Sequence, residues 1–425
     1  MTPQEFSIEV VQQLTEAGHV AYWAGGCVRD LLRGVEPNDF DVATDATPDQ
    51  VRKLFGKHRT LAVGESFGVI ILLGPESAGQ VEIATFRSEG EYLDGRRPES
   101  VAFCTPEQDA HRRDFTINGM FYDPLRQVVH DFVDGQTDLQ ARLVRAIGDP
   151  HDRMSEDKLR MLRAVRFAAV LDFELDFVTA NAVQEMASQI VVVSAERIAQ
   201  EFKKMLMHTN RARAMRLCET LGLMQVILPE VVSNTIQQSL EHWESTLSNL
   251  QYLTVQSFEA AFAILLGDVT TEAPANRKEE IPGSVRAICR RLKLSNAETD
   301  QIHWLVQHRE TLKTFPELSL AAKKQLAVAE HFTHLLDIES ALIAAGKRTS
   351  ENLDLVQQFL ADTPFAELSP PELITGQDLI DLGYKPGPKF NTWLRAVREA
   401  QLNNEISTRE QAVAIVQSFA SEKLR

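Results

Sequence analysis

Cysteine is scarce in this 425-residue chain, and its four cysteines stand far apart, at Cys27, Cys104, Cys218 and Cys289. They form neither the CxxC pair of a zinc site nor the pattern of a disulfide framework. Reduced thiols fit a cytoplasmic protein, which we therefore expect. Long apolar runs are also missing, since none approaches the roughly 18–20 residues that cross a bilayer. The N-terminal segment lacks the basic and then apolar regions of a signal peptide, so we expect no membrane contact.

Positive charge is in deficit along the whole chain. There are 44 lysines and arginines against 60 aspartates and glutamates, which gives a formal net charge of −16. This balance excludes a protein coated in positive charge, but phosphate contacts require only a local basic stripe. Nucleic acid is therefore compatible with the composition, and its binding should be strongly salt-dependent and weak away from such a stripe.

Two kinds of pattern follow each other along the chain. Between about residues 20 and 145, β-branched runs predict strands at Val63–Leu73 and Gln80–Phe86, with shorter ones at Val101–Phe103 and Val128–Phe132. From about Asp149 onward, helical periodicity dominates, interrupted at prolines. We therefore predict an α+β protein, with a small mixed sheet in its N-terminal part and only helices behind it. The predicted divisions are residues 1–148, 149–210, 211–340 and 341–425.

A glycine pair and two aspartates form the first chemical signal. Gly25 and Gly26 lie between a strand-like and a helix-like segment, where backbone N–H groups can approach a phosphate without a Cβ in the way. Asp39 and Asp41 follow, and residues two apart in a strand face the same side. Two adjacent carboxylates repel each other, and a divalent cation such as Mg²⁺ removes that penalty. Alone, Asp-x-Asp is more typical of solvated loop acids; with the glycine turn and Arg29 it favours metal-assisted nucleotidyl transfer.

A second basic feature is the adjacent pair Arg112 and Arg113, which precedes Asp114. Two neighbouring arginines cannot both face a core without partners. One of them is expected to hold a triphosphate, because guanidinium geometry suits phosphate oxygens, and the other to pair with Asp114. The polar stretch between Phe86 and Val101 is expected to be a mobile surface loop.

The segment Ser155–Ala169 is predicted to be one helix, capped by its first residue. Asp157 and Arg160 are three apart and so share a helix face. Cytosine and adenine both present an amino donor beside a ring-nitrogen acceptor, which a carboxylate and a guanidinium complement. Uracil and guanine present the reverse, which leaves each buried protein group unpaired at a cost of about 1–3 kcal/mol. The pair can thus select CTP and ATP without a template. The alternative is a surface salt-bridge ladder continued by Arg163, which could reach triphosphate, and by Arg166.

These segments resemble class II tRNA nucleotidyltransferases and the related bacterial poly(A) polymerases of the polymerase-β superfamily, through GGCVRDLLRG, NDFDVATDATP, HRRDFTIN and SEDKLRMLRAVRF. The resemblance implies a polymerase-β-like nucleotidyltransferase head, a neck that reads the nucleotide base, a helical body and a tail. It implies that Asp39 and Asp41 bind Mg²⁺ and that Gly26 and Arg29 contact the nucleotide. By motif position, Arg113 is a better nucleotide ligand than Arg112, and the second motif departs from the family at Gly119, where alanine is usual.

Three weaker assignments also rest on the resemblance. Glu82 resembles a third carboxylate that helps to take the proton from the attacking 3′-hydroxyl; a strand acid paired with Arg87 or another base is an equal alternative. The loop between Phe86 and Val101 is similar to that of enzymes that add the final A, or else it is a solvated loop without such a role. Ala195–Lys204 resembles the last motif of the family, which supports the template helix.

The rear half resembles an HD-type metal phosphohydrolase only loosely, through His242, Leu265–Asp268, His303 and His308. Glycine stands at position 267, where the His-Asp doublet needs its imidazole, so the ligand set is incomplete and we predict a degenerate module without phosphohydrolase activity. In the tail, a local basic face is either a tRNA backbone contact or an ordinary solvated helix face. It consists of Lys385, Lys389, Arg395 and Arg398.

The predicted reaction is the transfer of CMP and AMP from CTP and ATP to the 3′-hydroxyl of tRNA, with two Mg²⁺ ions and release of pyrophosphate. No protein partner is implied. Addition of A alone uses the same chemistry and stays open, as does poly(A) polymerase, although Val63–Val69 lacks the basic run typical of that branch. A non-catalytic RNA-binding protein is a distant alternative.

Overall fold

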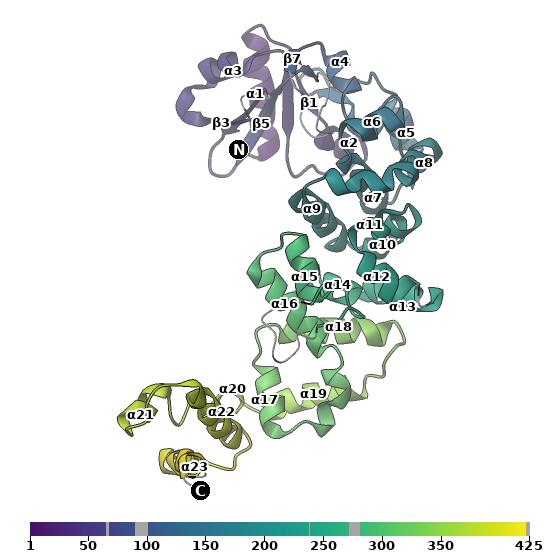
Figure 1. Ribbon diagram of the computed structural model, residues 1–425. Helices are drawn as coiled ribbons and strands as arrows, with labels where there is room; N and C mark the ends of the chain where they lie inside the picture. The colour runs from purple at the N-terminus through teal and green to yellow at the C-terminus, as the bar shows by residue number, and fades with distance from the viewer. Residues whose placement is uncertain (65–67, 90–100, 238, 272–280, 422–425) are drawn as a thin grey trace. The chain divides into compact units, whose positions relative to one another are not determined.

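The computed structural model of the chain describes residues 1–64, 68–89, 101–237, 239–271 and 281–421. The chain separates into two compact units (Figure 1). The first unit comprises Met1–Ser233 with Arg291–Lys293, and the second comprises Asn234–Arg290 with Leu294–Arg425. Strands occur only in the first unit of the described chain, which confirms the predicted α+β class. None of the described helices is both long and apolar enough to span a membrane.

The first unit contains a mixed sheet of seven strands among the described residues, in the order β3-β4-β5-β2-β1-β8-β9. β2 and β5 run parallel, and the other neighbours are antiparallel. The predicted strand Val63–Leu73 is divided between β3 and β4, which pair antiparallel, and Gly68 directly before β4 has φ +79°. The strands are β1 (Ala21–Ala24), β2 (Asp41–Thr44), β3 (Thr60–Gly64), β4 (Val69–Leu73), β5 (Gln80–Thr85), β8 (Phe121–Asp123) and β9 (Val128–His130).

Alternating burial along the strands builds the core of the sheet. Ile70 and Leu72 of β4 and Val81 and Ile83 of β5 are buried. The amphipathic helix α1 (Pro3–Glu16) packs against β1, β2 and β5. β6 (Arg87–Glu89) and β7 (Val101–Phe103) pair with each other, and the predicted mobile loop between them lies outside the described residues. The other helices of this part are α2 (Gly26–Leu32), α3 (Pro48–Phe55), α4 (Pro106–His111) and α5 (Gly135–Gln140).

The segment predicted as one helix from Ser155 is divided between two. Asp149 caps α6, since its carboxylate accepts from the backbone N–H groups of His151 at 2.8 Å and Asp152 at 3.1 Å. The predicted cap, Ser155, therefore lies inside α6, and extended backbone at Asp157 (φ −142°, ψ 105°) separates α6 from α7. The helices of this part are α6 (Pro150–Glu156), α7 (Leu159–Val170), α8 (Phe177–Met186), α9 (Ala195–Leu206), α10 (Arg211–Thr220), α11 (Leu223–Ile227) and α12 (Pro229–Val231), with the short strands β10 (Leu143–Val144) and β11 (Glu174–Leu175).

The second unit is helical throughout its described residues. α14 packs against α13, α16 and α18, and a separate apolar cluster near the C-terminus includes Leu379, Phe390, Val397 and Val416. The helices are α13 (Leu240–Tyr252), α14 (Phe258–Leu265), α15 (Val285–Arg291), α16 (Asn296–His308), α17 (Leu320–Ala327), α18 (Phe332–Ala344), α19 (Glu351–Asp362), α20 (Phe365–Leu368), α21 (Gly376–Asp381), α22 (Pro388–Leu402) and α23 (Arg409–Ser421).

Candidate active site

The glycine turn joins β1 to α2 and brings an arginine close to the backbone. Gly25 has φ +76°, which L side chains rarely adopt, and a Cβ there would lie 3.3 Å from Nη1 of Arg113. Glycine therefore allows the guanidinium to approach the turn. From α2, the buried Arg29 donates from Nη1 to Oδ1 of Asn118 at 2.7 Å and from Nη2 to Oδ2 of Asp30 at 2.8 Å. The turn is thus lined by two arginines held in place by acceptors.

Two carboxylates lie side by side next to this turn. Asp41 of β2 and Glu82 of β5 are register partners in the parallel pair, and each keeps an exposed surface. The pKa of Asp41 is raised to about 6, first because neighbouring protein atoms exclude water from it, and then because Glu82 and Asp39 add negative charge; the Arg113 cation acts in the opposite direction. The negative charge is therefore incompletely compensated, a condition that a divalent cation relieves.

Asp39 does not share a strand with Asp41 as predicted, although it lies near enough for its charge to raise the pKa of Asp41. β2 begins at Asp41, and Asp39 lies in the preceding segment, where it lines a recess with Asn38, Glu76 and Gln80. Across the described residues, no three Asp, Glu, His or Cys side chains converge into a metal cluster. The donors still fit Mg²⁺, because this ion takes one or two carboxylates and completes its octahedron with water and substrate phosphates.

Asp109 of α4 holds both adjacent arginines. Its Oδ1 lies 2.7 Å from Nη2 of Arg112, and its Oδ2 lies 3.0 Å from Nη2 of Arg113. Burial of Asp109 acts to raise its pKa, but the two guanidinium charges outweigh it and the pKa is lowered. The expected partner, Asp114, instead accepts from Arg163 of α7 at 2.6 and 2.8 Å. Asp109 stands three and four residues before the arginines, the spacing of neighbours on one helix face, and this spacing was the overlooked signal.

Asp157 and Arg160 do not share a helix face as predicted, because the helix is interrupted between them. Arg197 of α9 donates from Nη1 and Nη2 to the two oxygens of the Asp157 carboxylate, at 3.1 and 2.6 Å. Arg160, the second residue of α7, donates to Oε2 of Glu156 at 2.5 Å and to the backbone carbonyl of Arg112 at 3.0 Å. Each member of the predicted base-reading pair therefore has its own partner. Arg197 was not predicted, since tertiary structure alone brings it to Asp157.

A series of contacts joins the glycine turn to α7. Asn118, which accepts from Arg29, donates from Nδ2 to Oδ1 of Asp114 at 3.2 Å, and Asp114 binds Arg163. Burial acts to raise the pKa of Asp114, but the Arg163 cation lowers it to about 2. Arg29 and Arg163 also lie 5.4 and 5.3 Å from the centre of the Phe167 ring. The glycine turn, which Gly26 continues as the first residue of α2, and the middle of α7 are therefore parts of one connected arrangement.

α9 supports α7, as the sequence predicted for Ala195–Lys204. Arg166 donates from Nε to Oε2 of the buried Glu201 at 2.5 Å, and its guanidinium lies 4.0 Å from the centre of the Phe167 ring. Arg166 is thus engaged between α7 and α9, so its predicted contact with nucleotide has less support from the structure than that of Arg163, whose side chain is 32% exposed.

Three of the four members of the predicted basic face of the tail form no side-chain hydrogen bond or ion pair with any residue that the structure describes. Lys385, Lys389 and Arg395 are exposed. Arg398 is half-buried and donates from Nη1 to the carbonyl of Pro370 at 2.7 Å, so it acts within the fold. Among the histidines of the HD-like match, His242 hydrogen-bonds Asp268, whereas His303 and His308 contact the backbone carbonyls of Thr271 and Trp304. These three distances are 2.5, 3.2 and 2.9 Å.

The sequence matches three known domain models. They are "Poly A polymerase head domain" over residues 21–145, "Probable RNA and SrmB- binding site of polymerase A" over residues 172–234, and "tRNA nucleotidyltransferase domain 2" over residues 279–416. Among characterised proteins, the chain is 33% identical over 413 residues to the CCA-adding enzyme of Bacillus subtilis, covering 96% of both chains. It is 32% identical over 419 residues to that of Lactococcus lactis subsp. lactis, covering 97% of this chain and 96% of the relative.

Comparison with solved structures also finds CCA-adding enzymes. The Bacillus stearothermophilus CCA-adding enzyme in complex with CTP superposes with a TM-score of 0.77 at 25% identity, covering 100% of this chain and 99% of the other. The Thermotoga maritima enzyme complexed with tRNA has a similar fold, with a TM-score of 0.61 at 19% identity, covering 98% and 95%. The mixed sheet, glycine turn and paired acids thus define a nucleotidyltransferase. More particularly, the chain belongs to the family of CCA-adding enzymes, the tRNA nucleotidyltransferases.

Proposed function

We propose that this enzyme adds C and A residues to the 3′ end of tRNA, by transferring CMP from CTP and AMP from ATP and releasing pyrophosphate. The observation that carries the proposal is the placement of Asp41 opposite Glu82, beside a glycine turn and Arg113. Full-length similarity to CCA-adding enzymes supports both CCA addition and a divalent metal. Working on tRNA, the enzyme is proposed to be cytoplasmic.

Asp39 and Asp41 are the proposed ligands of the metal, which we take to be Mg²⁺. When bound, Mg²⁺ would neutralise phosphate charge and polarise the attacking and leaving oxygens. Asp41 is most effective as a ligand when deprotonated, above its pKa of about 6. Glu82 lies beside it and is proposed to accept the proton of the tRNA 3′-hydroxyl. If Glu82 is instead a strand acid paired with a base, its replacement is not expected to abolish activity.

Arginines around the turn are proposed to bind the triphosphate. Arg113 is the first choice because it reaches the turn at Gly25, and Arg112 is the second. Gly26 and Arg29 complete the nucleotide contacts, and Arg163 is available from α7. Guanidinium groups suit phosphate oxygens because they offer two parallel donors.

The base is proposed to be read by Asp157 and Arg160. The pairing of Asp157 with Arg197 does not exhaust its carboxylate, which has about four acceptor positions, and Arg160 likewise has five donors. Existing partners therefore hold both groups still while leaving capacity for a base. A fixed orientation sharpens selection between bases, because a side chain that cannot turn cannot adapt to uracil or guanine.

The remaining parts are assigned by position in the sequence. We propose residues 1–148 as the catalytic head, 149–210 as the neck that reads the base, 211–340 as the body and 341–425 as the tail. Lys385, Lys389 and Arg395 are the proposed contacts of the tail with the tRNA backbone, since they are exposed.

The decisive experiment offers the enzyme three tRNAs, ending at the discriminator base, at CC and at CCA, with each nucleoside triphosphate supplied separately. We expect CTP to extend the first tRNA by two residues and ATP to extend the second by one, with release of pyrophosphate and no extension of the third. Extension only of the tRNA ending in CC would indicate an A-adding enzyme, and long A tails would indicate a poly(A) polymerase. Asp41→Ala should abolish every transfer while leaving tRNA binding intact; transfer by this variant would contradict the proposed metal site.

A further inference from the structure

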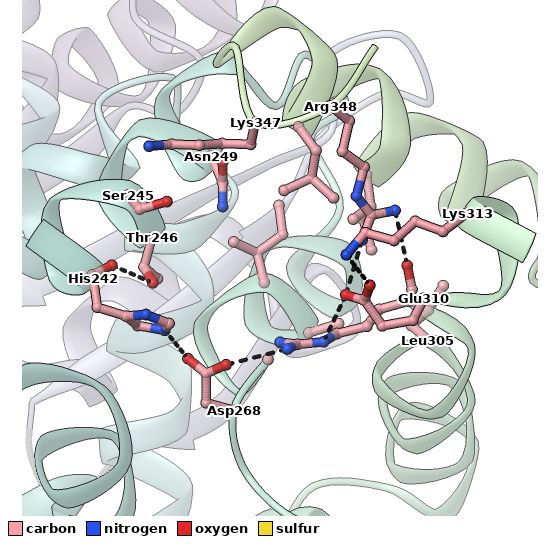
Figure 2. A pocket seen from close by; sticks show the side chains of 16 residues that line it. His242, Ser245, Thr246, Asn249, Asp268, Leu305, Glu310, Lys313, Lys347 and Arg348 are labelled. Atoms are coloured by element: carbon pink, nitrogen blue, oxygen red, sulfur yellow. Dashed lines mark hydrogen bonds and ion pairs between the residues drawn. The ribbon is translucent and has the colours of Figure 1, made fainter. Parts of the chain in front are cut away.

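The second unit contains a cavity that has no role in the proposed nucleotidyl transfer. Its volume is about 290 Å³, and residues of α13, α14, α16 and α18 line it (Figure 2). α13 contributes hydroxyl and amide groups from Ser245, Thr246 and Asn249. Apolar side chains form another part of the wall, among them Ile264 and Leu342. A volume near 300 Å³ with a mixed lining is typical of the smaller ligand pockets.

Arg309 places a cation against Asp268, the acid that follows Gly267 in the HD-like match. Asp268 accepts from Nε2 of His242 at 2.5 Å and from Nη2 of Arg309 at 3.2 Å (Figure 2). A Cβ at position 267 would lie too close to Nη1 of Arg309, so a larger residue there requires the guanidinium to move. The imidazole of an HD doublet would displace this guanidinium. The charge of Asp268 is therefore matched by a side chain of the protein rather than left for a metal.

Cations outnumber anions at the wall of the cavity. Four lysines and arginines face two acids, Asp268 and Glu310, in a chain whose net charge is −16. Cations still outnumber acids when the count includes Glu339, which accepts from Arg348. An anion can therefore be held without requiring another charged partner. The four cations are Arg309, Lys313, Lys347 and Arg348.

Lys347 differs from the other cations because its ammonium group is not already paired. Lys313 lies 2.5 Å from Oε2 of Glu310, and Arg348 lies 2.9 Å from Oε1 of the same residue. Lys347 is exposed and its side chain has no hydrogen bond or ion pair with any residue that the structure describes. Figure 2 places it on the same side of the cavity as Ser245 and Asn249. An unpaired ammonium beside hydroxyl and amide donors is a suitable environment for a phosphate.

We propose that this cavity binds a small free molecule carrying a phosphomonoester. The phosphate contacts Lys347 and the donors of Ser245 and Asn249, since the Thr246 hydroxyl already donates to the carbonyl of His242, and the organic part packs against Ile264 and Leu342. A recess bounded by helices suits a free molecule, whereas RNA phosphates are met by extended basic stripes on a surface. The site is independent of the proposed reaction in the head, so either proposal can fail without the other.

The test is calorimetric titration of the full chain with AMP, ribose 5-phosphate and adenosine. Wild type is expected to bind both phosphates and to bind adenosine at least about tenfold more weakly, because loss of a charge-assisted hydrogen bond has that effect. Lys347→Met should weaken ribose 5-phosphate by a similar factor. Lys53→Met, at an exposed lysine of α3, is the matched control and should change nothing. AMP bound in the head would be the same in both variants, so their difference reports the cavity.

A second variant tests the cavity without a change of charge. Ser245 makes no hydrogen bond through its side chain within the described chain, so Ser245→Phe fills the space and removes no such contact. Ser245→Phe should abolish binding of ribose 5-phosphate. If Lys347→Met does not fold, this variant alone tests whether the cavity is the binding site. Unchanged binding in both variants would overturn the proposal. So would a loss of tRNA affinity in Lys347→Met with ribose 5-phosphate binding retained, which would assign this cation to RNA.

Discussion

At the scale of single residues, the acids of the first unit differ in how their charge is compensated. Asp109, Asp114 and Asp157 each bind an arginine. Asp41 instead faces Glu82 across the β2–β5 pair, and its pKa is raised to about 6 by exclusion of water and by neighbouring negative charge. A residue kept in an unfavourable state in the free protein indicates a role that is completed on binding.

The raised pKa of Asp41 predicts a measurable effect on stability. Its ordinary value is 3.8 and its value in the fold is about 6, so between these pH values the native state binds more protons than the unfolded state. Stability then falls as pH rises through that window. In the absence of divalent metal, Asp41→Asn should therefore melt at a higher temperature than wild type at pH 7, and the two should converge near pH 4. Glu36→Gln, at an exposed acid, is the control; an equal gap at both pH values would contradict the assignment.

Gly119, the departure from the family motif, has a packing reason. A Cβ there would lie 2.6 Å from Cγ2 of Val133 and 3.0 Å from Cδ1 of Ile147. Gly119→Ala, although it restores the residue usual in the family, should destabilise the first unit by about 1–3 kcal/mol through overpacking. Denaturant titration measures this change. Gly376→Ala, where no atom lies within 4 Å of the added Cβ, is the control and should cause no such loss.

The pairing of Asp157 with Arg197 predicts a defect in nucleotide choice. Asp157→Ala removes the acceptor for the amino group, so the preference for CTP over UTP should fall by about 10–100-fold. Arg197→Met keeps the carboxylate but frees its orientation, and we expect a smaller loss of preference with a raised KM for CTP. Arg142→Met, which breaks an exposed ion pair, is the control. Competition between radiolabelled CTP and UTP measures the ratio, and an unchanged ratio in Asp157→Ala would refute base reading by this residue.

At the scale of elements, α9 fixes the position of α7. Arg197 holds Asp157, two residues before α7 begins, and Arg166 from the middle of α7 binds the buried Glu201. Two attachments on one helix define both the position and the rotation of α7. We therefore expect α9 to influence the nucleotide site, although it has no predicted contacts to substrate.

Breaking the buried attachment should therefore be costly. Glu201→Leu leaves Arg166 buried without its partner, and we expect a loss of about 3–5 kcal/mol in the unfolding free energy of the first unit. The double variant with Arg166→Met should recover much of this loss, since no unpaired charge remains. Denaturant titration followed by circular dichroism measures both. Equal stability of the single and double variants would show that the buried charge does not cause the loss.

At the scale of the whole molecule, a net charge of −16 confines RNA binding to local basic surfaces. In the tail, Lys385, Lys389 and Arg395 are exposed, whereas Arg398 is engaged with Pro370. We therefore expect RNA to bind at such local basic surfaces, because the net negative charge of the chain disfavours phosphate elsewhere.

Variants of the tail distinguish residues that contact RNA from a residue that stabilises the fold. Replacing Lys385, Lys389 and Arg395 together by alanine should raise the KM for tRNA with little change in kcat, and should reduce the salt dependence of binding by about 0.7–0.9 log units per lost phosphate contact. Arg398→Met should instead lower the melting temperature, because the half-buried carbonyl of Pro370 loses its donor. Filter binding at several salt concentrations and thermal unfolding distinguish the two effects. An unchanged salt slope in the triple variant would mean that these cations form an ordinary solvated face.

Local patterns determined much of this protein. The alternation of β-branched residues predicted the strands that hold Glu82, and the glycine pair and the spaced acids predicted where nucleotide chemistry would occur. Such features are set by backbone conformation and by side chains close together in the sequence, so they can be read from it. Similarity across the full chain then established the family.

Tertiary structure alone decided which charges meet. Sequence spacing predicted one helix with Asp157 and Arg160 on its face, but Asp149 and Pro150 begin a helix earlier and the backbone opens at Asp157. Arg197, forty residues away in the sequence, then takes that carboxylate. Partners of this kind depend on how elements pack, and the energy of a buried ion pair depends on the burial that packing creates. The cavity beside Arg309 has the same origin, since its wall comes from four separate helices and the segments that follow them.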